Sequence, residues 1–265
     1  MKKTHFFIWI LTLTLFFTGC ASAPKEADIN AEALKAYNEV KAKSKISTNK
    51  EWTDMLNRVA PRIAKASGEN FQWEWMLIDS PEVNAWCMPG GKMAVYTGIM
   101  PVLKNEAALA AVLGHEVAHA TKRHGKEQYA RAMKQNVAGL VIGGAAILGG
   151  QLLCKTDTCK TLTGLGGAAA GFAIQFFSMK YSRDDETEAD EYGQEYMARA
   201  GYDPAENIEL WKRMGAANQG KAPPEFMSTH PSDVNRQANL KKWLPRAEDI
   251  YTKSPVKYGL GENIR

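Results

Sequence analysis

Three residues, His115, Glu116 and His119, form a His-Glu-x-x-His pattern. Histidines four positions apart lie on one face of an α-helix, so both imidazole rings can reach one metal ion. Zn²⁺ binds neutral histidine nitrogen and lowers the pKa of the water that it binds to about 7. Glu116 would accept the proton of that water and pass it to the leaving amine. The pattern predicts a zinc hydrolase without separating a peptidase from an amidase; the alternative is a structural histidine pair on an apolar helix.

A catalytic zinc site also needs a third protein ligand and an open position. One class of zinc peptidases extends the motif with a glycine and a third histidine. Here those two places hold Lys122 and Gly125, which excludes that class. His124 lies about 140° around the helix from His119. We therefore expect His124 to be a solvated residue near the helix C-terminus.

The candidates for the third ligand lie in an acid-rich segment, residues 182–193. Glu186 and Asp190 are four positions apart and share a helix face, which Ala189 and Gly193 keep narrow. This spacing permits Glu186 as a zinc ligand and Asp190 as the acceptor for the N–H of a ligating histidine. A solvated acidic helix face has the same composition, and the spacing alone leaves the two interpretations even.

A buried helix must carry the motif, and the surrounding sequence predicts one. Asn105 can cap a helix that runs to about His124, with Gly125 after its end. Further helices are expected at residues 52–63, 137–153, 162–177, 184–200, 205–217 and 232–243. Short strands are expected at residues 71–78, 84–88 and 92–96, the last two around the turn Pro89-Gly90-Gly91. Together these elements predict a mainly α chain with a small β-sheet, in the α+β class.

Composition and charge limit the class of protein. The 265 residues fit one large catalytic domain with a terminal extension, or two small domains, and 45% hydrophobic and 23% charged residues are ordinary for a globular chain. Collagen, a coiled coil and global disorder are therefore excluded. The net charge is +4, with the basic residues scattered along the chain. This distribution predicts no nucleic-acid partner, because such a partner would require a basic patch or stripe.

The N-terminus has the pattern of a bacterial secretory signal. Lys2 and Lys3 precede an apolar run that is too short to span a bilayer. The run ends in Phe17-Thr18-Gly19-Cys20, which resembles the lipobox of bacterial lipoproteins and predicts lipidation of Cys20. Ala21 rather than Asp follows the cysteine, which by the usual sorting rule predicts the outer membrane of a Gram-negative bacterium, facing the periplasm.

Two further cysteines, Cys154 and Cys159, flank a four-residue polar tip between two apolar segments rich in Gly and Ala. In an oxidising compartment we expect a disulfide between them, and a second metal site is the alternative. Cys87 is then expected to be a buried thiol. The apolar hairpin itself is expected to be either a packed helix pair over the active-site cleft or a shallow membrane contact.

Four ordered motifs resemble peptidase family M48, the membrane-associated zinc metallopeptidases that include CAAX-prenyl-protease-like and HtpX-like enzymes. The motifs are His115-Glu116-x-x-His119, Ser182-Arg183-x-x-Glu186-x-x-Ala189-Asp190-x-x-Gly193, Asn84-Ala85-Trp86 with Pro89-Gly90-Gly91, and Ser228-Thr229-His230-Pro231 with Arg236. They run in this family's pattern over most of the folded chain, and the lipobox is similar to that of its periplasmic lipoprotein branch.

The resemblance implies a zincin-like (gluzincin) metallopeptidase domain with one Zn²⁺ per chain. Its ligands would be His115, His119 and Glu186, with Asp190 supporting them. His230 would either fill the open zinc position and keep the enzyme latent or, with Arg236, contact the substrate or a bound oxyanion. An edge strand would bind the substrate backbone; its residues would be Lys92, Met93, Ala94, Val95 and Tyr96, together with Asn84.

The implied function is an endopeptidase that cleaves misfolded or stalled envelope proteins, and the alternative is a chaperone-like holdase with latent protease activity. Its partners would be unfolded envelope proteins and, through lipidated Cys20, the membrane. The predicted division of the chain is a signal peptide (1–19), a lipidated tether with at most one loose helix (20–50), the peptidase domain (51–250, with a helical hairpin insert at 137–179) and a C-terminal tail (251–265).

Overall fold

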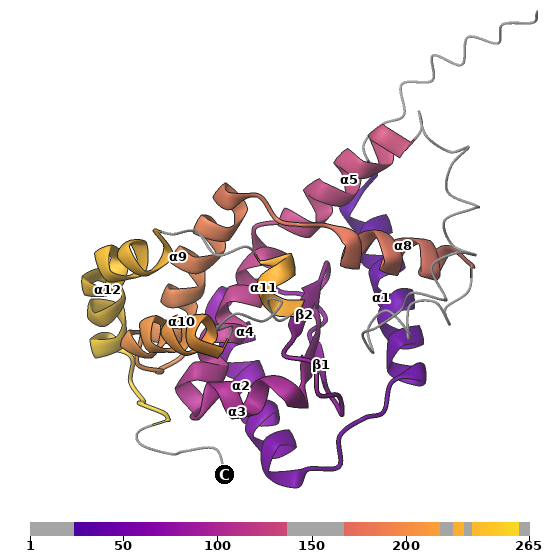
Figure 1. The fold of residues 1–265 in the computed structure, drawn as a ribbon. Helices are drawn as coiled ribbons and strands as arrows, with labels where there is room; N and C mark the ends of the chain where they lie inside the picture. Colours follow the sequence, from indigo (N-terminus) through magenta and orange to yellow (C-terminus); the bar gives the residue numbers. More distant parts are fainter. Residues whose placement is uncertain (1–23, 137–166, 218–224, 231–234, 260–265) are drawn as a thin grey trace, which may run out of the picture.

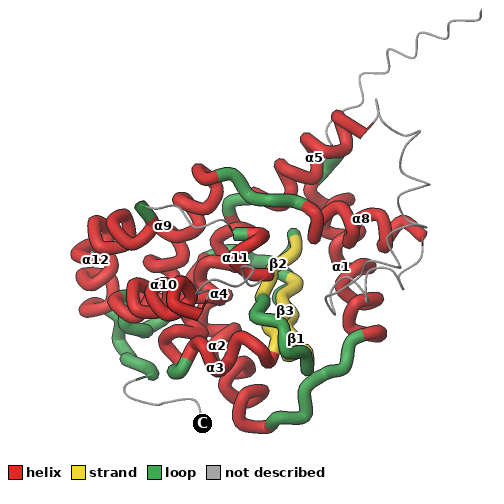
Figure 2. The backbone as a smooth tube through the Cα atoms, viewed as in Figure 1, coloured by secondary structure: helices red, strands yellow, loops and turns green. Residues whose placement is uncertain are grey.

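The computed structural model describes residues 24–136, 167–217, 225–230 and 235–259. Most of them are helical, around one small sheet (Figures 1 and 2). The helices are α1 (Glu26–Lys43), α2 (Lys50–Ser67), α3 (Met100–Leu103), α4 (Glu106–Thr121), α5 (His124–Asn136), α8 (Gly167–Ser178), α9 (Arg183–Arg199), α10 (Ala205–Ala217), α11 (Glu225–Thr229) and α12 (Arg236–Lys253). The strands are β1 (Glu74–Ile78), β2 (Ala85–Met88) and β3 (Lys92–Tyr96). The predicted fold class, mainly α with a small sheet, is confirmed.

The sheet lies in the middle of the molecule, with helices on both faces (Figure 1). Its order is β1-β3-β2, with β1 parallel and β2 antiparallel to β3. Side chains alternate between the two faces of a strand. Met93 and Val95 pack into the core formed with α2 and α4, whereas Ala94 and Tyr96 pack toward α1 and α8. The strands are apolar on both faces because both faces are covered.

Helix α1 covers the outer face of the sheet, which differs from the loose helix expected in a tether. It buries five side chains along one stripe: Ile29, Ala33, Ala36, Tyr37 and Val40. Two of the five are alanines, whose small side chains let the helix approach its neighbours closely. Because this segment contains few large apolar residues, the sequence predicted a tether. The structure instead has a packed helix.

Helix α4, which carries the His-Glu-x-x-His motif, is buried over its whole length. Its N-terminus is capped as predicted, because the Asn105 side chain accepts a hydrogen bond from the Ala108 N–H at 2.8 Å. The helix ends at Thr121, three residues earlier than expected. Arg123 adopts a left-handed conformation (φ 63°) there, which turns the chain into α5. His124 therefore begins a new helix with a different direction.

Helices α4 and α9 cross at two glycines, Gly114 and Gly193. A Cβ atom on Gly193 would lie 2.7 Å from the His115 backbone nitrogen, and one on Gly114 would lie 2.6 Å from the Gly193 carbonyl oxygen. The two backbones are therefore in direct contact. This close approach brings the side chains of α9 to those of α4, and any side chain at the crossing would separate the helices.

Replacing Gly193 by Ala is expected to destabilise the chain by about 2 kcal/mol, as overpacking does in a close-packed core. The physical reason is that the neighbour is backbone, which cannot rotate away. Thermal unfolding of the full chain measures the effect. Gly215→Ala is the matched control: Gly215 lies on an exposed part of α10, and a Cβ atom there would have nothing within 4 Å, so alanine should be neutral or stabilising. Equal midpoints for the two variants would contradict the close crossing.

Helix α8 belongs to the predicted apolar hairpin and packs on α1 through Phe172, Ala173 and Phe176. Most of the hairpin, residues 137–166, lies outside the described residues, as do Cys20, Cys154 and Cys159. Cys87 is a buried free thiol, as predicted. In the described parts of the chain, no helix combines the length and apolar character needed to cross a membrane.

Candidate metal centre

Four side chains from three parts of the chain converge in the interior. Helix α4 contributes His115 and His119, α9 contributes Glu186, and His230 follows α11. Their ligand atoms all lie within 4.8 Å of one another, and all four residues are buried. The structure thus brings the two histidines of the motif, the predicted carboxylate and the late histidine into one cluster.

Two residues behind this cluster hold its members in place. Asp190 Oδ1 lies 2.9 Å from His115 Nδ1, so this ring nitrogen donates outward and Nε2 faces the cluster with its lone pair. Arg236 bridges two carboxylates of α9: its Nε donates to Asp190 and its Nη2 to Glu186, both at 2.5 Å. Arg236 is itself buried. In this conformation its guanidinium faces these two carboxylates, whereas the expected contact was with the substrate or a bound oxyanion.

The donor atoms fit a zinc ion. The Nε2 atoms of His115 and His119 are 3.0 Å apart, and His230 Nδ1 lies 3.2 Å from His115 Nε2. Glu186 Oε1 lies 3.3 Å from His119 Nε2. Imidazole nitrogens and one carboxylate oxygen in a buried, compact set are the ligands that zinc accepts. These four residues could therefore hold one metal ion.

The carboxylates differ in their electrostatics. Burial raises the pKa of Glu116 above its usual value. Burial raises the pKa of Glu186, but the charge of His230 and the hydrogen-bond contacts with His119 and His230 outweigh it and hold this pKa well below its usual value. Glu186 is thus suited to a cation, whereas burial makes Glu116 a stronger proton acceptor than an exposed glutamate.

Glu116 lies beside the cluster without belonging to it. A backbone hydrogen bond from Cys87 of β2 lowers the pKa of its carboxylate, opposing burial, and its Oε1 lies 3.4 Å from His230 Nε2. That oxygen makes no hydrogen bond with any residue in the described ranges. One buried carboxylate oxygen therefore keeps its acceptor capacity.

The strand expected to bind substrate at its edge is in the wrong place for that role. β3 (Lys92–Tyr96) is the middle strand, and β1 and β2 occupy both of its sides. The prediction for Lys92, Met93, Ala94, Val95 and Tyr96 is therefore wrong. β2 is the edge strand next to α4, and Asn84, just before it, accepts a backbone hydrogen bond from the Tyr96 N–H at 3.0 Å. The sequence placed the hairpin correctly, but strand order depends on where the distant β1 pairs.

An apolar pocket opens beside Glu116. It is lined by Asn84, Ala85, Trp86, Glu116, Phe176, Phe177, Met179, Tyr181, Thr229 and His230. Tyr181 covers the metal cluster from this side, stacked on His119 with 3.8 Å between ring centroids and 26° between planes. Edge strand, aromatic side chains and catalytic candidates thus share one pocket.

His124 is buried, not solvated as expected. Its Nδ1 lies 3.0 Å from His119 Nδ1, and its Nε2 lies 3.0 Å from Glu188 Oε2. The expectation assumed that α4 continued to His124. The left-handed turn at Arg123 instead redirects His124 inward.

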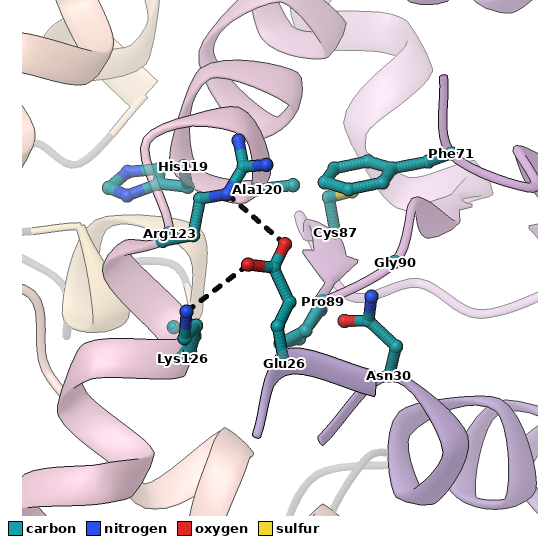
Figure 3. A pocket seen from close by; sticks show the side chains of 11 residues that line it. Glu26, Asn30, Phe71, Cys87, Pro89, Gly90, His119, Ala120, Arg123 and Lys126 are labelled. Carbon is teal, nitrogen blue, oxygen red and sulfur yellow. Dashed lines mark hydrogen bonds and ion pairs between the residues drawn. The ribbon is translucent and has the colours of Figure 1, made fainter. Parts of the chain in front are cut away.

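A second small pocket lies between the N-terminus of α1 and the end of α4, with His119 in its lining (Figure 3). Glu26 of α1 pairs with Arg123 at 3.2 Å and Lys126 at 3.1 Å. These pairs are partly exposed, so each stabilises the chain by at most about 1 kcal/mol. They nevertheless hold α1 against the segment that follows the metal-binding helix.

Three contributions to the site were not predicted from the sequence: the buried contact of His124, the stacking of Tyr181, and the Cys87 N–H on Glu116. Tyr181 directly precedes the Ser182-Arg183 motif, and this proximity was the available signal for it. The other two depend on a turn and on strand placement, for which local sequence carries no signal.

Comparison with known proteins gives a consistent match. A family model described as Peptidase family M48 matches residues 47–244. Mitochondrial metalloendopeptidase OMA1 of Schizosaccharomyces pombe is 39% identical over 197 residues, covering 73% of this chain and 53% of that protein. The protein of the same name from Saccharomyces cerevisiae is 33% identical, with the same shares covered.

A bacterial relative is similar over a comparable length. The beta-barrel assembly-enhancing protease of Escherichia coli (strain K12) is 29% identical over 212 residues, which cover 79% of this chain and 42% of that protein. The chain spans about half the length of the curated relatives it matches.

Proposed function

This chain belongs to peptidase family M48, and from that premise we propose that it is a zinc-dependent endopeptidase with one Zn²⁺ per chain. The convergence of His115, His119 and Glu186 in one buried cluster carries the proposal. These three residues would hold the ion, and Asp190 would orient His115. Zinc bound there would supply Lewis-acid catalysis of peptide hydrolysis.

Glu116 is the proposed general base and general acid. Its carboxylate has an oxygen free of hydrogen bonds with the residues described, and the backbone of Cys87 lowers the pKa of the group against the larger effect of burial. It would take a proton from the attacking water and return it to the amine that leaves. Burial raises its pKa, which favours the protonated form needed for the second of these steps.

The substrate would bind along β2. This strand is the edge of the sheet nearest Glu116, and an extended peptide can add to such an edge through backbone hydrogen bonds. Its side chains would enter the apolar pocket lined by Trp86, Phe176 and Phe177. An edge strand that pairs with backbone and an apolar pocket together suit unfolded polypeptides, because these expose both their backbone groups and their apolar side chains.

We further propose that the chain acts on misfolded or stalled envelope proteins, as a lipoprotein on the periplasmic face of the outer membrane. The lipobox ending in Cys20 and the name of the Escherichia coli relative support this location and substrate class. The OMA1 relatives are named mitochondrial, so the N-terminal segment carries the argument. We expect the parent chain to incorporate radiolabelled palmitate and the Cys20→Ala variant to incorporate none. Labelling that persists in Cys20→Ala would contradict the lipid anchor at this residue.

The test of the activity uses the full chain in detergent with an unfolded outer-membrane β-barrel protein. Fragments are expected on a gel, and none after treatment with a zinc chelator, because the proposed ligands then hold no ion. Adding back Zn²⁺ should restore cleavage. Cleavage that persists in the chelated protein would contradict a metallopeptidase.

His230 is the proposed latency residue. A catalytic zinc site keeps a fourth position open, but the described cluster already has four protein donors. His230 would have to leave before water or substrate could enter. Replacing His230 by Ala is therefore expected to raise the initial rate of cleavage several-fold, measured with the same unfolded substrate. A rate below that of the parent chain would instead support contact of His230 with substrate.

The same closed arrangement favours a second candidate function, that of a holdase with latent proteolysis. His230 completes the cluster, and Tyr181, stacked on His119 and His230, covers it from the side of the apolar pocket. A holdase would suppress aggregation of unfolded substrate without fragments appearing. The two functions are separated by light scattering of an aggregating outer-membrane protein in the presence of the Glu116→Gln variant. Suppression of aggregation by this variant would favour the holdase.

A further inference from the structure

His124 makes an unusual contact for a histidine outside the metal cluster. It is 3% exposed and lies directly behind His119, with the two Nδ1 atoms 3.0 Å apart. Its other ring nitrogen, Nε2, lies 3.0 Å from Glu188 Oε2. Lys122 Nζ in turn lies 3.3 Å from Glu188 Oε1. A chain of contacts thus runs from His119 through His124 to a carboxylate near the surface.

Proton bookkeeping assigns a direction to this chain. A neutral imidazole has one N–H, and its other nitrogen accepts. His119 Nε2 faces the cluster, 3.3 Å from Glu186 Oε1 and 3.0 Å from His115 Nε2. To offer that nitrogen to a metal, His119 must carry its proton on Nδ1. His124 Nδ1 then accepts this proton's hydrogen bond, and the His124 proton lies on Nε2, which donates to Glu188. Each contact then has one donor and one acceptor.

The other ligating histidine receives equivalent support by a shorter route. His115 Nδ1 lies 2.9 Å from Asp190 Oδ1. For His119 the carboxylate of Glu188 is too far for a direct contact, and the imidazole of His124 spans the gap. Hydrogen bonds of this kind set the tautomer and ring orientation of metal-bound histidines.

We propose that His124, held by Glu188, is a positioning residue for His119: it accepts the His119 Nδ1–H and so presents Nε2 to the metal. This inference rests on the proposed zinc site. It adds a requirement that the His-Glu-x-x-His pattern does not contain, since the supporting histidine lies beyond the helix end in a separate helix.

Two variants of His124 separate positioning from packing. His124→Leu keeps an apolar side chain of similar size but removes the acceptor. His124→Asn places an amide oxygen where Nδ1 was and keeps it. The zinc dissociation constant of the full chain in detergent is measured by competition with a chromogenic chelator. We expect a 10- to 100-fold increase in this constant for His124→Leu and a change within about threefold for His124→Asn. The cobalt-substituted protein should keep its visible spectrum in His124→Asn and change it in His124→Leu.

A second pair of variants tests the far end of the chain of contacts. Glu188→Ala should weaken zinc binding about threefold to tenfold by the same mechanism. Glu191→Ala, one turn along on α9 and paired with Arg246, should leave zinc affinity unchanged. Thermal unfolding of the metal-free variants reports any general loss of structure.

The outcomes are distinct. Zinc binding by His124→Leu as tight as that of the parent chain would overturn the positioning role, and so would equal weakening in His124→Leu and His124→Asn. A parent chain that binds no zinc would overturn the proposed function itself, because the parent is measured before any variant.

Discussion

Replacing Glu116 by Gln is expected to reduce peptide cleavage by about 10²- to 10⁴-fold, the range that a positioned general acid–base contributes. The amide has nearly the same shape as the carboxylate but accepts no proton. Zinc affinity should change by less than about threefold, because Glu116 lies outside the group of four potential ligands. The variant thus isolates proton transfer from metal binding.

Initial rates on the unfolded outer-membrane substrate measure this effect, with metal content determined on the same samples. Undiminished cleavage by Glu116→Gln would place the activity in another site or another protein. If a cellular role in envelope quality control survived in this variant, the holdase function would be favoured over proteolysis.

Replacing Arg236 by Met is expected to lower the free energy of unfolding by about 3–5 kcal/mol, the usual effect of removing one partner from a buried ion pair. Arg236 contacts Glu186 and Asp190 at 2.5 Å, and all three side chains are almost fully buried. Without the guanidinium, the buried carboxylates of Glu186 and Asp190 would lose their cationic partner and keep only their contacts with histidines. Trp211, on which the guanidinium stacks at 3.9 Å, would lose that contact too.

Denaturant unfolding of the metal-free chain measures the loss. Arg236→Lys is the matched control: it keeps the positive charge but has one ammonium group in place of the planar fork, so we expect an intermediate loss. A change below about 1 kcal/mol for Arg236→Met would show that water or a rearranged partner already compensates for the two carboxylates.

Local periodicity predicted much of the architecture. The helix at 205–217 and the strand at 92–96 have the predicted bounds, and the helix of the motif begins at its predicted cap. The errors fall where distant elements meet. The helix expected near residues 20–50 is packed on the sheet, and β3 is a middle strand, because β1 pairs with it across more than a dozen residues of chain.

Local sequence spacing predicts which side chains share a helix face. The four-residue spacings of His115 and His119, and of Glu186 and Asp190, are helical geometry, which is local and so readable without a fold. Their roles in zinc chemistry stay predictions for the experiments above.

The residues that those helix faces contact depend on the tertiary fold. Gly114 and Gly193 bring α4 and α9 into backbone contact, so Glu186 reaches the two histidines of the motif. The turn at Arg123 sends His124 behind His119, and α11 brings His230 in front of it. These contacts join residues 5 to 115 positions apart. These contacts depend on backbone turns and on core packing, and local sequence patterns predict neither of the two.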